Sequence, residues 1–158
     1  MDLKTILEQL AIAHVAPNDG AATTYALAAG TTDVNSSAVD ALGWKRVCFL
    51  CIFGDNADTG TFTGSIEGSA NGTDGWTAIT GATTSFTAGA SDTDNEMIGV
   101  ECDVNPTYRY YRFVSNRGTA NTVIAALLAL LGRRMGVSPI TQTVGAGQFI
   151  QTPVNVIE

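Results

Sequence analysis

The segment that most constrains the fold is residues 44–53, WKRVCFLCIF, which becomes entirely apolar after its two basic residues. It is rich in the β-branched and aromatic residues that favour strands. Successive side chains of a strand point to opposite faces. One face would hold Val47, Phe49, Cys51 and Phe53, and the other would hold Cys48, Leu50 and Ile52. Because both faces are apolar, we expect the domain core to cover one of them, and a second layer or another subunit to cover the other.

Shorter segments with strand character surround this one, and turn residues separate them. Residues 61–68 alternate between Phe, Gly and Ile on one side and Thr, Ser and Glu on the other, which predicts a half-buried strand. The dipeptides Asn71-Gly72 and Asp74-Gly75 are typical of tight turns. With 17 glycines and only 15% charged residues, the composition also favours a mostly β protein. Further strands are expected at 23–27, 76–79, 84–87, 96–104 and 108–114.

Residues 121–131 are ambiguous from their pattern. Their alanine and leucine content favours a helix by intrinsic propensity. Their position, after a turn at Gly118 and a series of strands, favours a buried strand, and we prefer the strand.

The two ends of the chain differ from this central region. We expect an N-terminal amphipathic helix or arm over 1–20, a β core over 21–134 and an extended C-terminal arm over 135–158. The first end has apolar residues at helical spacing, whereas the last end has isolated apolar residues among glycines and prolines. The residues that we expect to contact a partner are Leu3, Ile6, Leu7 and Leu10, and Ile140, Val144, Phe149, Ile150, Val154 and Ile157.

The charge of the chain argues against direct binding of nucleic acid or membrane. The net charge is −7 and the sequence pI is about 4.4, with no clustered basic residues of the kind that bind phosphates. The apolar stretch at 123–131 is much shorter than the roughly 20 residues of a membrane helix. We also expect no export signal, and the odd number of three cysteines predicts folding in a reducing compartment.

No constellation in the sequence predicts catalysis, a cofactor or a metal. Cys48 and Cys51 have CxxC spacing, but in a strand their sulfurs point to opposite faces, and a zinc site would need a second ligand pair. His14 is the only histidine, and it lies in a terminal segment. The acidic groups Asp55/Asp58 and Asp92/Asp94/Glu96 lack the calcium-loop pattern. We therefore expect a protein that is not an enzyme.

A carbohydrate-binding β-sandwich is one alternative function. Exposed Trp44, Trp76 or Tyr108 could stack on sugar rings. Packing of these aromatic side chains in the core or in an interface is the interpretation that we prefer.

The order of several motifs resembles a known protein family. The hydrophobic strand is preceded by a polar segment and then by the sequence VDALGW (39–44). It is followed by the hairpin GSANGTDGWTAITGAT (68–83), by an acidic strand and by the sequence YRYYRFV (108–114). A last apolar strand then ends with LGRR at residue 134. Over residues 33–134 this order resembles the small virion proteins of tailed bacteriophages that are called decoration or cement proteins.

That resemblance implies an antiparallel, jelly-roll-like β-sandwich that clamps capsid subunits at symmetry axes, with 121–131 as a strand. It implies the major capsid protein and further copies of the chain, as a dimer or trimer, as partners. The protein would be made in the cytoplasm of the bacterial host and lie on the virion capsid surface. The family has no catalytic residues to transfer. Its entry to the first core strand corresponds to Asp40, Gly43 and Trp44, and its Arg-Tyr-x-Arg strand corresponds to Arg109, Tyr110 and Arg112.

The two ends of the chain are not part of this family pattern, but both would suit arms that join one subunit to the next. Another virion component, such as a tail-tube, head-completion or baseplate protein, would share the composition and the arms. It is therefore the other alternative to a capsid cement protein.

Overall fold

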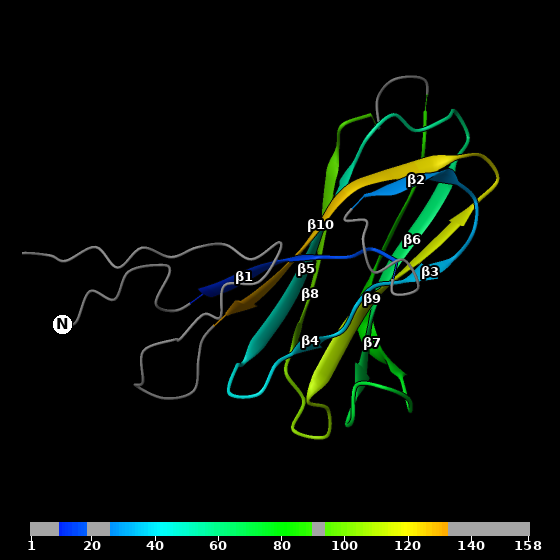
Figure 1. Cartoon of the computed structure of the whole chain (residues 1–158). Coiled ribbons are helices and arrows are strands. Elements are labelled where there is room, and N and C mark those ends of the chain that lie inside the picture. Colours follow the sequence, from blue (N-terminus) through cyan, green and yellow to red (C-terminus); the bar gives the residue numbers. More distant parts are fainter. Residues whose placement is uncertain (1–9, 19–25, 90–93, 133–158) are drawn as a thin grey trace, which may run out of the picture.

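The computed structural model describes residues 10–18, 26–89 and 94–132, and these residues form two antiparallel sheets without a helix (Figure 1). The first sheet has the order β1-β10-β5-β8, and β2 also pairs with β10; the second has the order β3-β9-β6-β7, and β4 also pairs with β9. The strands are β1 (Leu10–Val15), β2 (Leu27–Gly30), β3 (Val34–Asn35), β4 (Val39–Asp40), β5 (Arg46–Phe53), β6 (Thr61–Ser69), β7 (Thr77–Thr87), β8 (Met97–Asp103), β9 (Tyr110–Gly118) and β10 (Thr122–Gly132). The described part of the chain is therefore a β-sandwich, as expected for the core.

The strand expected at 44–53 is confirmed as β5, which is the central strand between β10 and β8. Its inward residues are fully buried: Val47, Phe49 and Cys51 are 0% exposed, and Phe53 is 1% exposed. Its outward residues are only half-buried. The predicted alternation is thus correct, but within the described residues the second apolar face is not fully covered.

Aromatic side chains hold the two sheets together. Phe53 of β5 makes edge-to-face contacts with Phe62 of β6 and Phe86 of β7, with ring centroids 4.8 and 4.9 Å apart. Phe49 of β5 reaches Phe113 of β9, with centroids 5.8 Å apart. A side chain on Gly64 would overlap the ring of Phe113, so the absence of a Cβ lets the ring approach the backbone of β6 closely. This cluster is the centre of the hydrophobic core.

The ambiguous segment at 121–131 is a strand, β10, as we preferred. Its buried residues Thr122 and Ile124 are followed by Leu127 and Ala129, so the inward positions shift by one residue along the strand. The pairing of β10 with β5 shifts at the same place, between Ile124 and Ala126. A β-bulge inserts such an extra residue, which explains why simple alternation is not visible in the sequence.

The expected N-terminal helix is wrong for the part that the structure describes. Residues 10–15 form strand β1, which pairs with β10 in six consecutive antiparallel positions and places Val15 in the core. The pairing with an apolar neighbouring strand outweighs the helical spacing of the leucines, because propensity is a weak local effect. Residues 1–9 lie outside the described residues.

Other boundaries differ in smaller ways from the prediction. The strands expected at 76–79 and 84–87 are one strand, β7, which passes through Gly81 at a positive φ of 81°. The polar segment before Gly43 contains the two short strands β3 and β4, which the sequence did not indicate. Of the strand expected at 23–27, only the last two residues are described, and Leu27 begins β2.

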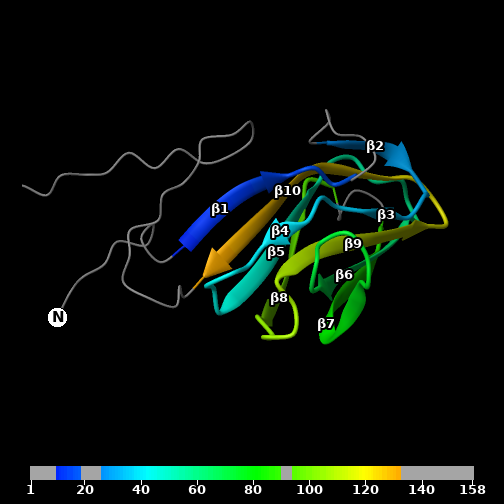
Figure 2. The ribbon, with the colours of Figure 1, turned by 60° about the horizontal axis from the view of Figure 1, so that its bottom comes forward.

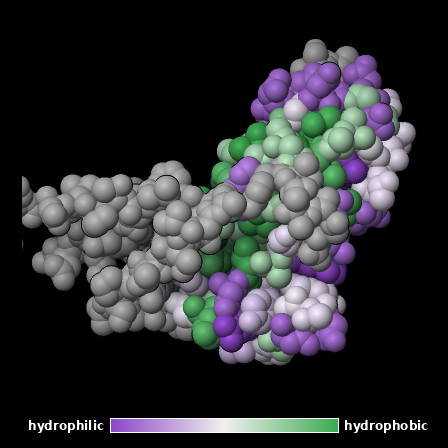
Figure 3. All heavy atoms as spheres, viewed as in Figure 1, coloured by the Kyte–Doolittle hydropathy of each residue, from purple (hydrophilic) through white to green (hydrophobic). Residues whose placement is uncertain are grey.

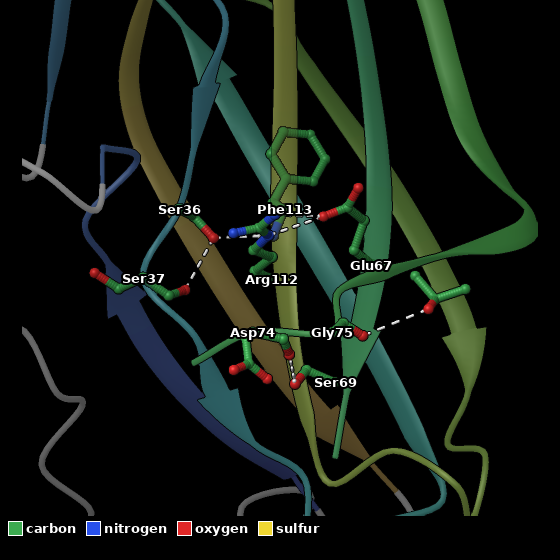
Figure 4. Close-up of polar contacts among 9 residues, drawn as sticks. Ser36, Ser37, Glu67, Ser69, Asp74, Gly75, Arg112 and Phe113 are labelled. Carbon is green, nitrogen blue, oxygen red and sulfur yellow. Dashed lines mark hydrogen bonds and ion pairs between the residues drawn. The ribbon is translucent and has the colours of Figure 1, made fainter. Parts of the chain in front are cut away.

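Two buried polar side chains connect the irregular segments to the sandwich. The Ser36 hydroxyl lies between β3 and β4, where it accepts a hydrogen bond from the Phe113 N–H at 2.9 Å and donates one to the Ser37 carbonyl (Figure 4). The Arg117 guanidinium is 6% exposed and donates to the carbonyls of Ala28, Thr32 and Thr122. Arg117 belongs to β9, so these bonds join the second sheet to β2 and β10 of the first.

Candidate interaction surface

The cysteines do not form a reactive or metal-binding site in the described structure. Cys48 and Cys51 point to opposite faces of β5, as predicted, and Cys102 is buried on β8. Burial raises the pKa of Cys51 to about 12 and that of Cys102 to about 11. Such thiols stay protonated near neutral pH and are poor nucleophiles and ligands. Burial, and then the charge of Glu101, also raises the pKa of the half-buried Cys48.

The other candidate chemical groups are also spread apart. His14 lies half-buried in β1, opposite Leu128 of β10. Asp55 and Asp58 are exposed in a loop, and the Asp94 carboxylate accepts a hydrogen bond from the Asn56 N–H at 2.8 Å. Within residues 10–18, 26–89 and 94–132, no group of three or more His, Cys, Asp or Glu side chains could hold a metal ion, and no helix could span a membrane. Asp92 lies outside the described residues.

The aromatic residues considered for sugar stacking are mostly engaged within the protein. Trp44 is 8% exposed and lies in the core, so it cannot present its ring to a ligand. Tyr108 is half-buried and packs against the core cluster. The half-buried Trp76 ring lies under the Arg112 guanidinium, 4.4 Å from its centroid. This leaves little of the aromatic surface that a sugar would stack on.

The outer side of the first sheet carries apolar side chains on all four strands of its main path, and we call it the apolar face. Antiparallel register aligns His14, Leu128, Leu50 and Gly99 in one row across the sheet, with Ile12, Leu130 and Cys48 beside it. In the view of Figure 3, green apolar atoms lie where β5 and β10 run in Figure 1. The face comprises Leu10 and Ile12 of β1, Ala126, Leu128 and Leu130 of β10, Cys48, Leu50 and Ile52 of β5, and Met97 and Gly99 of β8.

Gly99 and Met97, both on β8, extend the apolar face to the edge of the sheet. Leu50 leans toward β8, where a Cβ on Gly99 would lie only 3.0 Å from the Leu50 Cδ2 atom. Glycine at this position therefore leaves the leucine room to lie across the sheet. At the far end, Met97 is 57% exposed and extends the apolar surface to the sheet edge. Contiguous apolar surface of this kind typically marks a contact with another molecule.

Charged side chains lie at one end of the apolar face. Arg46 of β5 forms ion pairs with Glu101 at 2.5 Å and with Asp103 at 3.1 Å, both on β8. The carboxylates raise the pKa of the Arg46 guanidinium, so it stays charged. A rim of ion pairs beside an apolar centre is the usual anatomy of a protein interface.

The outer side of the second sheet is polar, and we call it the polar face. The Arg112 guanidinium of β9 donates to the Glu67 carboxylate of β6 at 2.7 and 2.9 Å (Figure 4). The same guanidinium covers the Trp76 ring. Hydroxyl side chains occupy most of the remaining outward positions of β6 and β7. They are Thr61, Thr63, Ser65, Thr83, Ser85 and Thr87.

Two of the positions that the resemblance singled out, Asp40 and Arg109, form an ion pair beside the polar face. Asp40 of β4 accepts hydrogen bonds from Arg109 at 2.5, 3.0 and 3.1 Å, and it also accepts one from the Leu42 N–H at 3.0 Å. The bonds from Arg109 lower the pKa of Asp40. Gly43, at a positive φ of 82°, then turns the chain toward the buried Trp44. These residues shape the entry to β5.

Of the residues expected to contact a partner, the structure describes only Leu10, and it places Leu10 on the apolar face. The others, from Leu3 to Leu7 and from Ile140 to Ile157, lie outside the described residues. The sequence indicated the contribution of β5 to this face and, through Leu10, part of that of β1, but it missed those of β8 and β10. Leu128 and Leu130 lie two residues apart, as residues on one face of a strand do. The bulge in β10 changes which residues point outward, so this spacing alone did not show that they lie on the apolar face.

Comparisons with known proteins do not assign the chain to a family. No protein-family model and no curated protein matches the chain. Among solved structures, the Eiger TNF of S. frugiperda is similar over 85% of this chain and 99% of its own, with 6% identity and a TM-score of 0.38. A family two carbohydrate esterase from Cellvibrio japonicus is similar over 84% of this chain, with 15% identity and a TM-score of 0.35, and the chain spans 33% of that esterase.

Proposed function

We propose that this chain is a non-enzymatic structural protein that binds other protein subunits through the apolar face. The observation that carries the proposal is the group of half-buried apolar side chains on the outer side of β1, β10 and β5, with Leu128 and Leu50 at its centre, which the exposed Met97 continues on β8. An antiparallel sheet that faces water on one side normally carries polar residues there. The polar face of the same protein follows that rule, and the apolar face does not.

We further propose that the partner is a phage capsid and that the chain acts as a cement protein on its outside. The strand orders β1-β10-β5-β8 and β3-β9-β6-β7 support the jelly-roll-like arrangement that the family resemblance implies. Jelly rolls occur in viral capsid proteins and in lectins. The order of motifs over 33–134 favours the capsid, with the major capsid protein as the partner.

The physical demand on such a protein is to add buried surface across joints between capsid subunits. Full burial of a leucine or isoleucine side chain contributes about 1.5–3 kcal/mol, and the half-buried side chains of the apolar face still have part of that to gain. Symmetry repeats the gain at every copy. The terminal segments would add further apolar contacts through residues such as Phe149 and Ile150, against the entropy lost when they become ordered.

Co-sedimentation with capsid shells tests this function. We expect the full chain to saturate shells assembled from the major capsid protein of the same phage at a fixed stoichiometry, and to raise their melting temperature. Deletion of 135–158 should leave a folded domain that binds the shells more weakly. Unchanged shell stability after that deletion would remove the C-terminal segment from the proposal.

Absence of shell binding would contradict the capsid assignment, and the form of the free protein would then point to an alternative. Rings or tubes in isolation would favour a tail-tube, head-completion or baseplate protein. An inert monomer would favour a carbohydrate-binding module, which a glycan screen with Trp76→Ala as the negative control would test.

A further inference from the structure

Among the described strands β1 pairs only with β10, and its other edge differs from the remaining edges of the two sheets. Every sheet edge presents unpaired N–H and C=O groups, and natural proteins protect such edges with charges, bulges or short strands. Among the described residues, one edge of the first sheet is formed by β1 and β2, and the other edge is formed by β8. In the second sheet, one edge is β7, and the short strands β3 and β4 together form the other. Figure 2 shows β1 on the outside of its sheet, next to β10.

Three of these edges carry a recognisable protection. β8 has the exposed carboxylates of Glu101 and Asp103. β7 carries exposed threonines and an irregularity, because its register with β6 shifts between Ser65 and Glu67. β3 and β4 are two residues long each.

β1 has none of these protections. Its sequence, LAIAHV, contains no Asp, Glu, Lys, Arg, Pro or Gly. It pairs with β10 in an unbroken register from Leu10–Gly132 to Val15–Leu127, so it is a regular strand along its whole length. A regular, uncharged and largely apolar edge is a template for another strand.

We propose that β1 of a second copy of this chain pairs with β1 in antiparallel orientation across a two-fold axis, so that the two first sheets become one continuous sheet. The proposal goes beyond the proposed function and does not depend on it, because the pairing needs no capsid. It assigns the edge of β1 as an interface between copies.

Charge favours a second copy at this edge over a second copy at β8. The chain carries a net charge of −7, so two copies repel each other wherever their acidic surfaces meet. A two-fold contact at β8 would bring Glu101 and Asp103 toward their own symmetry mates. A two-fold contact at β1 brings together only uncharged side chains and a histidine.

The side-chain alternation of β1 also suits pairing with itself. Residues directly opposite in an antiparallel pair lie on the same face of the sheet. In a two-fold pair, outward residues meet outward residues when Ile12 lies opposite Ile12 of the partner subunit, or opposite the partner's His14. Either register joins the two apolar faces into one surface of twice the width, and each places the core residue Val15 on the inner side.

The mass of the full chain in solution tests this inference, with sedimentation equilibrium as the readout. We expect a species of twice the 16.4 kDa chain mass at micromolar concentration. Ile12→Asp places two like charges next to each other at the edge, and it should raise the dissociation constant of the dimer at least about 100-fold. The matched control, Thr63→Asp, puts the same charge on an outward position of the second sheet and should leave the dimer intact.

Cysteine crosslinking separates edge pairing from stacking of two apolar faces. In a Cys48→Ser background, we expect Ile12→Cys alone, or mixed with His14→Cys, to form a disulfide between copies. Leu128→Cys lies on the same face but one strand further in, opposite His14, and should not crosslink. Circular dichroism of each variant checks that it is folded.

Three results would overturn the inference. The first is a monomer at all accessible concentrations of the full chain. The second is a dimer that folded Ile12→Asp does not weaken. The third is efficient crosslinking of Leu128→Cys when Ile12→Cys and His14→Cys do not crosslink. That result would show that the copies contact each other through the apolar face and not through the edge of β1. Shell binding is measured separately, so failure of this inference leaves the proposed function standing, and the reverse also holds.

Discussion

The two outer faces of this sandwich are built by the same alternation but carry opposite chemistry. On β6, the inward Phe62 and Ile66 alternate with Thr63, Ser65 and Glu67, so the polar face meets water as an antiparallel sheet normally does. On β5, the inward positions alternate with Cys48, Leu50 and Ile52, which remain half-buried. The domain needs only one apolar side per sheet to fold. We therefore propose that a contact outside the domain covers the second apolar side of the first sheet.

The largest effect should come from the interior that both faces share. Phe53→Ala removes a ring that contacts Phe62 and Phe86, and it should lower the free energy of unfolding by about 3–5 kcal/mol. Leu50→Ala, on the neighbouring outward position of the same strand, should cost much less. Urea denaturation followed by circular dichroism measures both. Equal losses would mean that the outward side of β5 is as much a part of the core as the inward side.

The next effect separates the two faces by binding. Leu128→Asp puts a charge at the centre of the apolar face, and it should weaken shell binding by at least about 30-fold, which corresponds to the roughly 2 kcal/mol of a hot-spot residue. Ser65→Asp puts the same charge on the polar face and should bind as the unchanged chain does. Co-sedimentation over a concentration series measures both affinities. A stronger effect of Ser65→Asp would reverse the assignment of the two faces.

A smaller effect tests what holds the polar face in place. Glu67→Gln removes the charge that binds the Arg112 guanidinium, and these side chains are only 22% and 16% exposed. We expect a loss of about 1–2 kcal/mol in the free energy of unfolding, typical of a hydrogen bond to a charged group. Glu101→Gln, at the more exposed ion pair on the rim of the apolar face, should change stability less. If the two variants destabilise equally, burial does not set the strength of these pairs.

The smallest effect is a pH dependence beside the polar face. The hydrogen bonds from Arg109 hold the pKa of Asp40 below its ordinary value of 3.8. A lowered pKa in the folded state stabilises the fold above the ordinary pKa, and this contribution disappears as the pH falls through the lowered value. Asp40→Asn should therefore be slightly less stable than the unchanged chain at pH 7, and the difference should vanish in strong acid. Urea titrations at several pH values would show a constant difference if Asp40 has no such role.

The strands with regular alternation could be predicted from the sequence, and those whose structure depends on a distant partner could not. The two faces of β5 follow directly from the order of its residues. For residues 10–15, helical spacing was misleading because their structure depends on pairing with β10, more than a hundred residues away in the chain. In β10 the bulge after Ile124 changes which residues point inward, and only the register with β5 reveals it.

The candidate surface was predictable only in part, for the same reason. The outward residues of β5 indicated a second apolar face that needs a cover. Its full extent depends on the register that brings Ile12, Leu130 and Cys48 together from three separate strands. Gly99 contributes by having no side chain, which hydrophobic patterning does not detect.

The protein already contains a probe, the Cys48 thiol, that reports whether the apolar face is the contact surface. Cys48 lies on the apolar face, whereas Cys51 and Cys102 are buried in the core with their pKa raised to about 12 and about 11. In the free, folded chain, a thiol reagent at mildly alkaline pH should label Cys48 first, as read by mass spectrometry of its peptide. If the apolar face is the contact surface, shell-bound protein should react at Cys48 at least about tenfold more slowly. An unchanged rate of Cys48 labelling in shell-bound protein would contradict the account.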